Sequence, residues 1–197
     1  VISHPLDQWL PGELSQNIAK ANEAFENYEY AAAQREVEDF FWRTYCDNYL
    51  EIVKRRTRFE GKPEAEELSA VYTLWHATDA LVRLFAPFIP CVTDALYDVM
   101  IGDREGMPTT VHARGMWPKA DEQAPAGVFE KEGEAFVQIL SAARKVKSEA
   151  QVSMKTAANT LTISGQGAGC VAELIGETSE DLKAVTSAGE IVRAETA

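Results

Sequence analysis

Cysteine is scarce in this 197-residue sequence, which contains only Cys46, Cys91 and Cys170. The three are odd in number, lie far apart and form no CxxC pair. The sequence therefore indicates neither a disulfide framework nor a zinc site. Such sparse use of cysteine is typical of a protein from a reducing compartment, and we expect a cytoplasmic location.

Long apolar runs are also missing. No stretch approaches the roughly 20 apolar residues that a membrane-spanning helix requires. The N-terminal residues have neither the basic segment nor the apolar core of a secretory signal. We therefore expect no membrane partner.

Groups that could form a catalytic site are few. His112 has no carboxylate or nucleophile at a recognisable spacing, so we interpret it as structural rather than as a general base. Gly165, Gly167 and Gly169 follow a predicted strand, but their spacing fits neither standard nucleotide loop. We predict no catalytic residue, no metal ligand and no cofactor site, and a stand-alone enzyme would need a catalytic group that we do not find.

Positive charge is in deficit, since 19 Lys and Arg face 31 Asp and Glu and the net charge is -12. Dedicated nucleic-acid binders are usually basic, so this balance favours a helical protein-interaction module without an RNA role. Two cationic clusters oppose that interpretation. They are Lys54, Arg55, Arg56, Arg58 and Lys62, and then Arg144, Lys145 and Lys147. An acidic domain with such a stripe should bind RNA weakly and lose that binding quickly as salt rises.

What the chain does contain is helical periodicity, interrupted by short turns. It predicts helices over residues 1–28, with a break at Pro11 and Gly12, over residues 29–58, and from Pro63 to just before Pro87. Short turns between long helices favour an antiparallel bundle. The third helix has a stripe that we expect to be buried: Leu68, Val71, Tyr72, Trp75, Thr78, Val82 and Phe85.

The fold class we predict is mainly α, an antiparallel helix bundle followed by a small α/β appendix. We place the bundle in residues 1–122, a connecting helix in 123–156 and a βαβ-like appendix in 157–197. In the appendix, alternation predicts strands at 161–164 and 191–194. Two short helices are expected between them, at 170–175 and 179–185.

Residues 40–58 are the segment on which a functional interpretation depends. One side of the predicted helix is mostly apolar, and the other carries Arg43, Asp47, Glu51, Lys54, Arg55 and Arg58. Its cationic end could hold phosphate. Alternatively, Arg43 with Asp47 and Glu51 with Arg55 are spaced i,i+4 and simply pair along an exposed helix. A buried Trp42 would cost about 3–5 kcal/mol on truncation to alanine, whereas an exposed one would leave the melting temperature nearly unchanged.

The same segment carries a family resemblance. Phe41-Trp42, Cys46-Asp47, Tyr49-Leu50-Glu51 and Lys54 with Arg56 resemble the pattern Phe-(aliphatic or Phe)-Trp…Cys-Asp-Trp-Tyr-Leu-Glu…Lys-x-Arg of valyl-tRNA synthetases. The chain departs at Asn48, where the family usually has Trp. Further similar motifs follow the family's order over about residues 5 to 156. They are Asp7 with Trp9-Leu10, Leu84 through Tyr97, Thr110-Val111-His112 with Trp117-Pro118, and Arg144 with Lys147-Ser148-Glu149.

The resemblance implies an anticodon-binding domain that binds the anticodon arm of tRNA(Val) and helps to place the acceptor end in a distant active site. It implies phosphate contacts from the second helix, and an exposed aromatic or amide that reads a splayed base. The candidate RNA-binding residues are Arg43, Asp47, Leu50, Glu51, Lys54, Arg55, Arg58, Arg144, Lys145 and Lys147. The same domain of an isoleucyl or leucyl enzyme, which shares the fold, is the alternative.

Motifs of the catalytic part are missing, because the sequence contains neither His-Ile-Gly-His nor Lys-Met-Ser-Lys-Ser. The chain thus resembles a C-terminal fragment of a valine-tRNA ligase. Catalytic and editing domains of a parent chain would then be its partners, and ATP and Mg would be cofactors of that parent enzyme and not of this part. We expect it to be monomeric.

Overall fold

The computed structural model describes residues 2–101, 106, 108–114, 117–120, 129–164 and 168–194. Side chains are described in these ranges except at 101, 114, 168–175 and 177. The elements in order are α1 (Pro5–Glu26), α2 (Tyr30–Asp39), the π-helix η1 (Phe40–Tyr49), α3 (Leu50–Val53), α4 (Ala65–Phe85), α5 (Pro90–Ile101), α6 (Val111–Arg114), α7 (Glu130–Glu149), β1 (Ala158–Ile163), α8 (Ala168–Thr186) and β2 (Ala188–Arg193).

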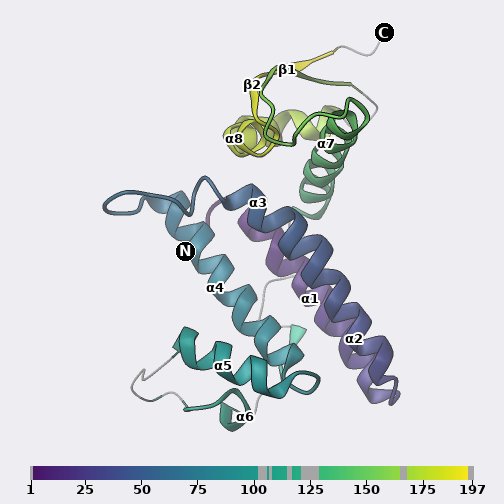
Figure 1. The fold of residues 1–197 in the computed structure, drawn as a ribbon, viewed down its shortest axis with the longest axis vertical. Helices are drawn as coiled ribbons and strands as arrows, with labels where there is room; N and C mark the ends of the chain where they lie inside the picture. The colour runs from purple at the N-terminus through teal and green to yellow at the C-terminus, as the bar shows by residue number, and fades with distance from the viewer. Residues whose placement is uncertain are drawn as a thin grey trace.

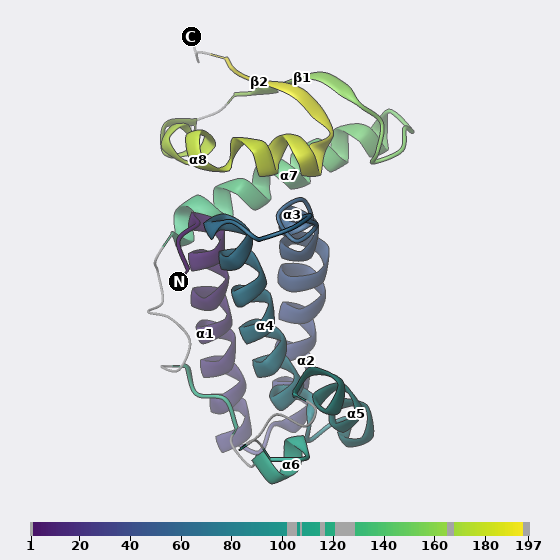
Figure 2. The same ribbon diagram turned by 90° about the vertical axis from the view of Figure 1, so that its left-hand side faces the viewer.

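Three long helical segments lie side by side: α1, α4 and the continuous helix made by α2, η1 and α3 (Figures 1 and 2). Helices α5 and α6 lie at one end of this bundle, and α7, α8 and the two strands lie at the other. The predicted class, a mainly α bundle with a small α/β appendix, is confirmed. No helix in the described ranges is long and apolar enough to cross a membrane.

Helix α1 is continuous, so the predicted break at Pro11 is wrong. Proline has no N–H to donate to the carbonyl four residues earlier, which is that of Asp7. The hydroxyl of Thr73 on α4 donates to this carbonyl instead, at 3.4 Å. The neighbouring helix thus supplies the missing partner, and both Pro11 and Gly12 are buried in the bundle.

The second helix differs from its prediction in length and in register. It ends at Val53 rather than at residue 58, and its middle ten residues form a π-helix. Hydrogen bonds in a π-helix run from i to i+5, so the buried face passes through Phe40, Tyr45 and Tyr49. Trp42 is 59% exposed, which answers the question that its sequence position left open.

Helix α4 begins with a capping box between Glu64 and Glu67 and ends at Phe85, two residues before Pro87, as predicted. Its buried stripe was predicted partly on the wrong side, because Leu68 and Tyr72 are exposed, as is Val71 between them. Small residues dominate the side that packs into the bundle. The buried positions include Ser69, Ala70, Thr73, Ala77, Ala80, Leu81 and Leu84.

The appendix is a βαβ unit with β1 and β2 parallel, in register from Ala158 opposite Ala188 to Ile163 opposite Arg193. One helix, α8, makes the whole crossover, so the predicted pair of short helices is wrong. Gly165 and Gly167 of the glycine-rich segment lie outside the described residues.

The appendix and the bundle share one hydrophobic cluster. Leu10 and Ile18 of α1 lie in it together with Phe136 of α7, Ile163 of β1 and Leu182 of α8. Helix α7 therefore packs against both parts, and the boundaries that we placed at residues 122 and 156 stay a prediction.

Candidate nucleic-acid interface

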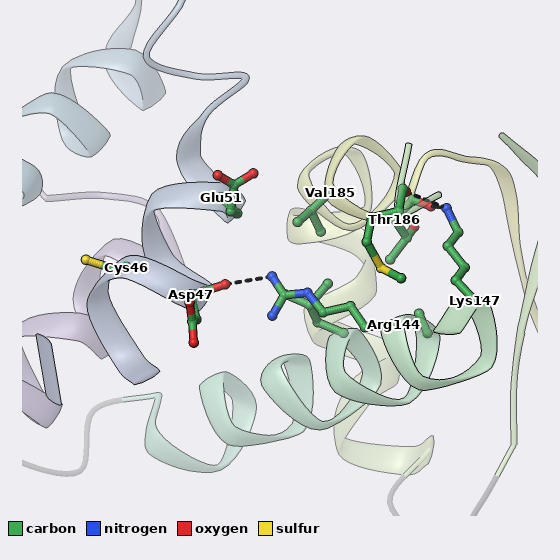
Figure 3. Close-up of a pocket in the computed structure, with 10 residues that line it drawn as sticks. Cys46, Asp47, Glu51, Arg144, Lys147, Val185 and Thr186 are labelled. Atoms are coloured by element: carbon green, nitrogen blue, oxygen red, sulfur yellow. Dashed lines mark hydrogen bonds between the residues drawn. The ribbon is translucent and has the colours of Figure 1, made fainter. Parts of the chain in front are cut away.

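A crevice of about 450 Å³ separates the η1–α3 segment from α7 and α8 (Figure 3). It places Arg144 and Lys147 of the second cationic cluster opposite Asp47 and Glu51, which precede the first cluster in the chain. The lining residues are Cys46, Asp47, Glu51, Leu140, Ala143, Arg144, Lys147, Met154, Val185 and Thr186.

Arg144 crosses this crevice from α7 to the π-helix. Its guanidinium donates to the side-chain oxygen of Asn48 at 2.9 Å and to the main-chain carbonyl of Asp47 at 2.6 Å. The amide of Asn48 in turn donates to the carbonyl of Arg43 at 2.7 Å. Asn48, the position at which the chain departs from the family pattern, thus accepts one of the two hydrogen bonds by which Arg144 joins α7 to η1.

Lys147 also lines the crevice, on the side away from η1 (Figure 3). Its ammonium donates to the carbonyls of Met154, Thr156 and Thr186, at 2.9, 2.6 and 2.8 Å. A lysine has three N–H donors, so none remains for a phosphate. Its geometry is that of a residue that joins α7, the chain after it and the end of α8.

Other cations of the candidate set make weak pairs at the surface. Arg43 lies 3.5 Å from Asp39, and Lys145 lies 4.0 Å from Glu149. Exposed pairs of this kind contribute about 0–1 kcal/mol. A phosphate group can therefore take over either cation at little cost to the fold.

The i,i+4 pairs that the sequence suggested do not form. Glu51 accepts from Lys54 at 2.9 Å, and Arg55 reaches Asp181 of α8 at 3.2 Å. Arg58 is exposed, whereas Leu50 is half-buried against the main hydrophobic cluster. Arg55 therefore joins the segment after α3 to α8, although its side chain is partly exposed.

Arg56 belongs entirely to the interior, with 2% of its surface exposed. Its guanidinium donates to both carboxylate oxygens of Asp7, at 2.7 and 2.8 Å, and to Asp181 at 2.8 Å. A further bond, of 3.2 Å, goes to the carbonyl of Glu66. One buried side chain thus ties the turn after α3 to α1, α4 and α8.

Titration in this network follows from burial and charge. Burial alone would lower the pKa of Arg56, but the hydrogen bonds and charges of Asp7 and Asp181 raise it above its usual value. Tyr49 donates to Asp7 at 2.8 Å, and burial, followed by the charge of Asp7, raises the pKa of its phenol. Burial, and then the positive charge of Arg56, lowers the pKa of His4. The cluster therefore favours a charged arginine and a neutral histidine.

Cys46 lines the crevice but is not activated as a nucleophile. Burial and the neighbouring Asp47 raise the pKa of the Cys46 thiol, which keeps it protonated and unreactive near neutral pH. In the described ranges, no group of His, Cys, Asp and Glu side chains is arranged to hold a metal ion. What the crevice offers is charged side chains and hydrogen-bonding groups.

Sequence reasoning did not place Trp42 among the candidate contacts. Its ring lies edge-on to Phe41 at 4.9 Å, on the exposed side of η1, about one turn before Cys46. Arg35 and Asp39 precede it at helical spacing on the polar side of α2. That neighbourhood was the signal in the sequence that the ring faces outward.

The model of the family "Anticodon-binding domain of tRNA ligase" matches residues 7–162. A valine–tRNA ligase of Rickettsia felis is 38% identical over 191 residues, which are 96% of this chain and 21% of that protein. Its counterpart in Ehrlichia canis is 38% identical over 162 residues, 82% of this chain and 20% of the relative. The counterpart in Anaplasma marginale is 37% identical over 187 residues, 95% of this chain and 21% of the relative. The chain therefore spans about a fifth of the length of these relatives.

Proposed function

Because the chain belongs to the family of anticodon-binding domains of tRNA ligases, we propose that it binds the anticodon arm of tRNA(Val). The identity of the tRNA is taken from relatives named valine–tRNA ligase. For the longer protein we propose ligation of valine to this tRNA, with ATP and Mg as cofactors of the catalytic part. This chain supplies recognition, and the bond is made elsewhere in the polypeptide.

One observation carries the proposal: the outer side of η1 presents an exposed aromatic ring beside an exposed cation, and the C-terminal part of α7, which contains Arg144, Lys145 and Lys147, contacts the same helix. Trp42 offers a face on which a splayed loop base can stack, a contact worth about 1–3 kcal/mol per base. Arg43 and Lys145 are held only by weak surface pairs that phosphates can replace. Arg58 and Lys54 extend the cationic edge beyond α3.

The carboxylates at the crevice have a role in specificity. Asp47 and Glu51 are exposed and accept hydrogen bonds, so they suit the exocyclic amino group of a base and repel a phosphate that is out of register. Arg144 acts differently, because its donors are engaged with η1. We assign it to positioning η1 rather than to contacting RNA.

The test is a titration of labelled anticodon stem-loops, valine against isoleucine, across a salt series. In the full-length protein, Arg43→Glu with Arg58→Glu should weaken binding. If each arginine meets one phosphate, the slope of log K against log salt should become shallower by about 1.4–1.8. Lys20→Glu with Lys119→Glu, a matched reversal of two exposed lysines outside the crevice, should leave the slope nearly unchanged.

Unchanged affinity in the folded double variant would place the contact surface elsewhere. A preference for the isoleucine stem-loop would assign the chain to the sister synthetases. No binding by the full-length protein at low salt would favour the interaction module that the net charge of -12 suggests.

A further inference from the structure

The π-helix η1 joins two stretches of helix whose buried faces are out of phase. Val37 and Phe40 are buried and three residues apart. Tyr45 and Tyr49 are buried and four residues apart, and both separations are those of one face of an α-helix. Phe40 and Tyr45, however, are five residues apart, so the segment between them accommodates one residue more than an α-helix would. The place of this extra residue decides which neighbouring side chains face the bundle.

Trp42 is the side chain whose position depends most on this change of phase. In phase with Tyr45 and Tyr49, it falls at the i, i+3, i+7 spacing of one helix face and would share their buried side. In phase with α2, it follows Arg35 and Asp39 at the i, i+4, i+7 spacing of the polar side. The ring is 59% exposed, so the change of phase comes after Trp42. The same indole would turn toward the bundle if the change came before it.

Asn48 stabilises the wider spacing within η1. Its side-chain amide donates to the carbonyl of Arg43 at 2.7 Å. That carbonyl lies five residues earlier, which is the separation that a π-helix bridges. The backbone N–H of Leu50 likewise donates to the carbonyl of Tyr45, five residues before it. The amide of Asn48 therefore adds a side-chain bond to the i to i+5 pattern of the backbone.

Arg144 stabilises the last turn of η1 from outside. Where i to i+5 spacing returns to i to i+4, two successive carbonyls face the same N–H, so one of them needs another donor. The guanidinium of Arg144 reaches this turn from α7 and donates to the carbonyl of Asp47 at 2.6 Å (Figure 3). It also donates to the side-chain oxygen of Asn48 at 2.9 Å, which orients the amide toward Arg43. The register of η1 is thus tied to a second helix.

We propose that Asn48, held by Arg144, is a positioning residue for base recognition. The two side chains keep the change of phase after Trp42, so the indole stays on the outer side of η1, where an unstacked base can stack on it. The inference rests on the proposed function, in which the chain binds an anticodon loop. Asn48 is the position at which the chain departs from the pattern of valyl-tRNA synthetases, so this role is not one that the resemblance implies.

Hydroxyl-radical labelling of the full-length protein, without RNA, reports solvent access to the indole. We express it as the ratio of Trp42 to Tyr28 labelling, since Tyr28 is 79% exposed in the turn after α1. Asn48→Leu and Arg144→Met should each lower this ratio severalfold, because Trp42 then turns into phase with the buried tyrosines. The double variant should lower it no further than Arg144→Met alone, because both changes remove one shared contact. Lys131→Met, which removes an exposed cation from the first turn of α7, should leave the ratio unchanged.

Binding of the anticodon stem-loop of tRNA(Val) to the full-length protein is the second readout. If a base stacks on Trp42, Trp42→Ala should weaken binding about 5–150-fold. Asn48→Leu should weaken binding to a similar extent, and Trp42→Ala should have no further effect in the Asn48→Leu protein. The slope of log K against log salt should stay unchanged in these variants, because neither removes a phosphate contact. A merely structural role of Asn48 would make the two effects on affinity additive.

The outcomes separate the role of Asn48 from RNA binding itself. A labelling ratio that is unchanged or raised in both single variants would overturn the inference, whether or not stem-loops bind; unfolding would raise the ratio, so it cannot imitate the expected fall. A lowered ratio with unchanged stem-loop affinity would also overturn it, because the indole would then have no part in base recognition. A lowered ratio in a protein that binds no stem-loop at low salt would refute the proposed function, and base recognition with it, while the effect of Asn48 on the register of η1 would stand.

Discussion

Removing the guanidinium of Arg56 is the most informative test of how this fold is held together. Arg56→Leu would leave the carboxylates of Asp7 and Asp181 buried and deprived of their common cation. Both carboxylates are almost fully buried, so water cannot replace the lost partner. The cost is therefore that of an uncompensated buried charge, rather than the value of a salt bridge.

Breaking a buried ion pair by removing one partner typically costs about 3–5 kcal/mol. Two contacts in the structure reduce the cost here. Tyr49 still donates to Asp7 at 2.8 Å, and Arg55 still lies 3.2 Å from Asp181. We therefore expect a loss of about 3 kcal/mol, a large share of the 5–15 kcal/mol by which a domain is stable.

Urea denaturation of the 197-residue chain, followed by far-ultraviolet circular dichroism, measures this loss as a lower midpoint at unchanged m value. Lys54→Leu is the control, because its ion pair with Glu51 is half-exposed and should contribute no more than about 1 kcal/mol. If Arg56→Leu were as mild as Lys54→Leu, the buried network would not be a main source of stability, and the reasoning would fail.

Two further predictions concern stability. The pKa of His4 is lowered in the folded chain, so the unfolded state binds more protons below pH about 6.5, and the unfolding free energy should fall as pH drops from 7 toward 5. His4→Gln should flatten this dependence in denaturation curves; an unchanged slope would contradict the assignment. Gly176→Ala should raise the free energy of unfolding by up to about 1 kcal/mol, because the new Cβ meets open space and alanine favours a helix. Gly133→Ala should instead lower the free energy of unfolding by about 1–2 kcal/mol, because its new Cβ overlaps the indole of Trp9. Equal effects of the two substitutions on the urea midpoint would show that the indole moves aside freely.

Much of the fold could be predicted because local signals decided it. Proline near residues 63 and 87 bounds α4. Alternating apolar residues near Leu161 and Ile191 predicted the two strands that pair in the appendix. In each case the backbone has few alternatives, so the neighbours in sequence carry enough information.

Other features depend on partners far along the chain. Pro11 does not break α1, because Thr73 satisfies the carbonyl of Asp7. The π-helical register of residues 40–49 moves the buried face to Tyr45 and Tyr49. A periodicity of 3.6 residues cannot anticipate either, since one requires a neighbouring helix and the other a different hydrogen-bond spacing.

The candidate site shows the same division. The sequence placed the cations on two segments, but it could not tell which of these cations are engaged in hydrogen bonds within the fold. Arg56 is used by Asp7 and Asp181, and Lys147 by three carbonyls, one of them 39 residues away. Exposure, rather than charge, separates these from Arg43 and Arg58. The assignment of individual RNA contacts stays a prediction.

The net charge of -12 has a consequence for how such a chain can recognise RNA. At physiological salt, charges farther apart than about 8 Å are largely screened, so the local cations at the crevice matter more than the total. Those cations are few, and Asp47 and Glu51 lie among them, so the affinity for an anticodon loop alone should be modest. A second contact between the same tRNA and the rest of the polypeptide would make loop binding intramolecular and raise its effective concentration. That gain requires the two contacts to be held at a spacing that the tRNA can bridge. In such an arrangement the contacts at the anticodon loop provide specificity, and the second contact raises the affinity for the whole tRNA.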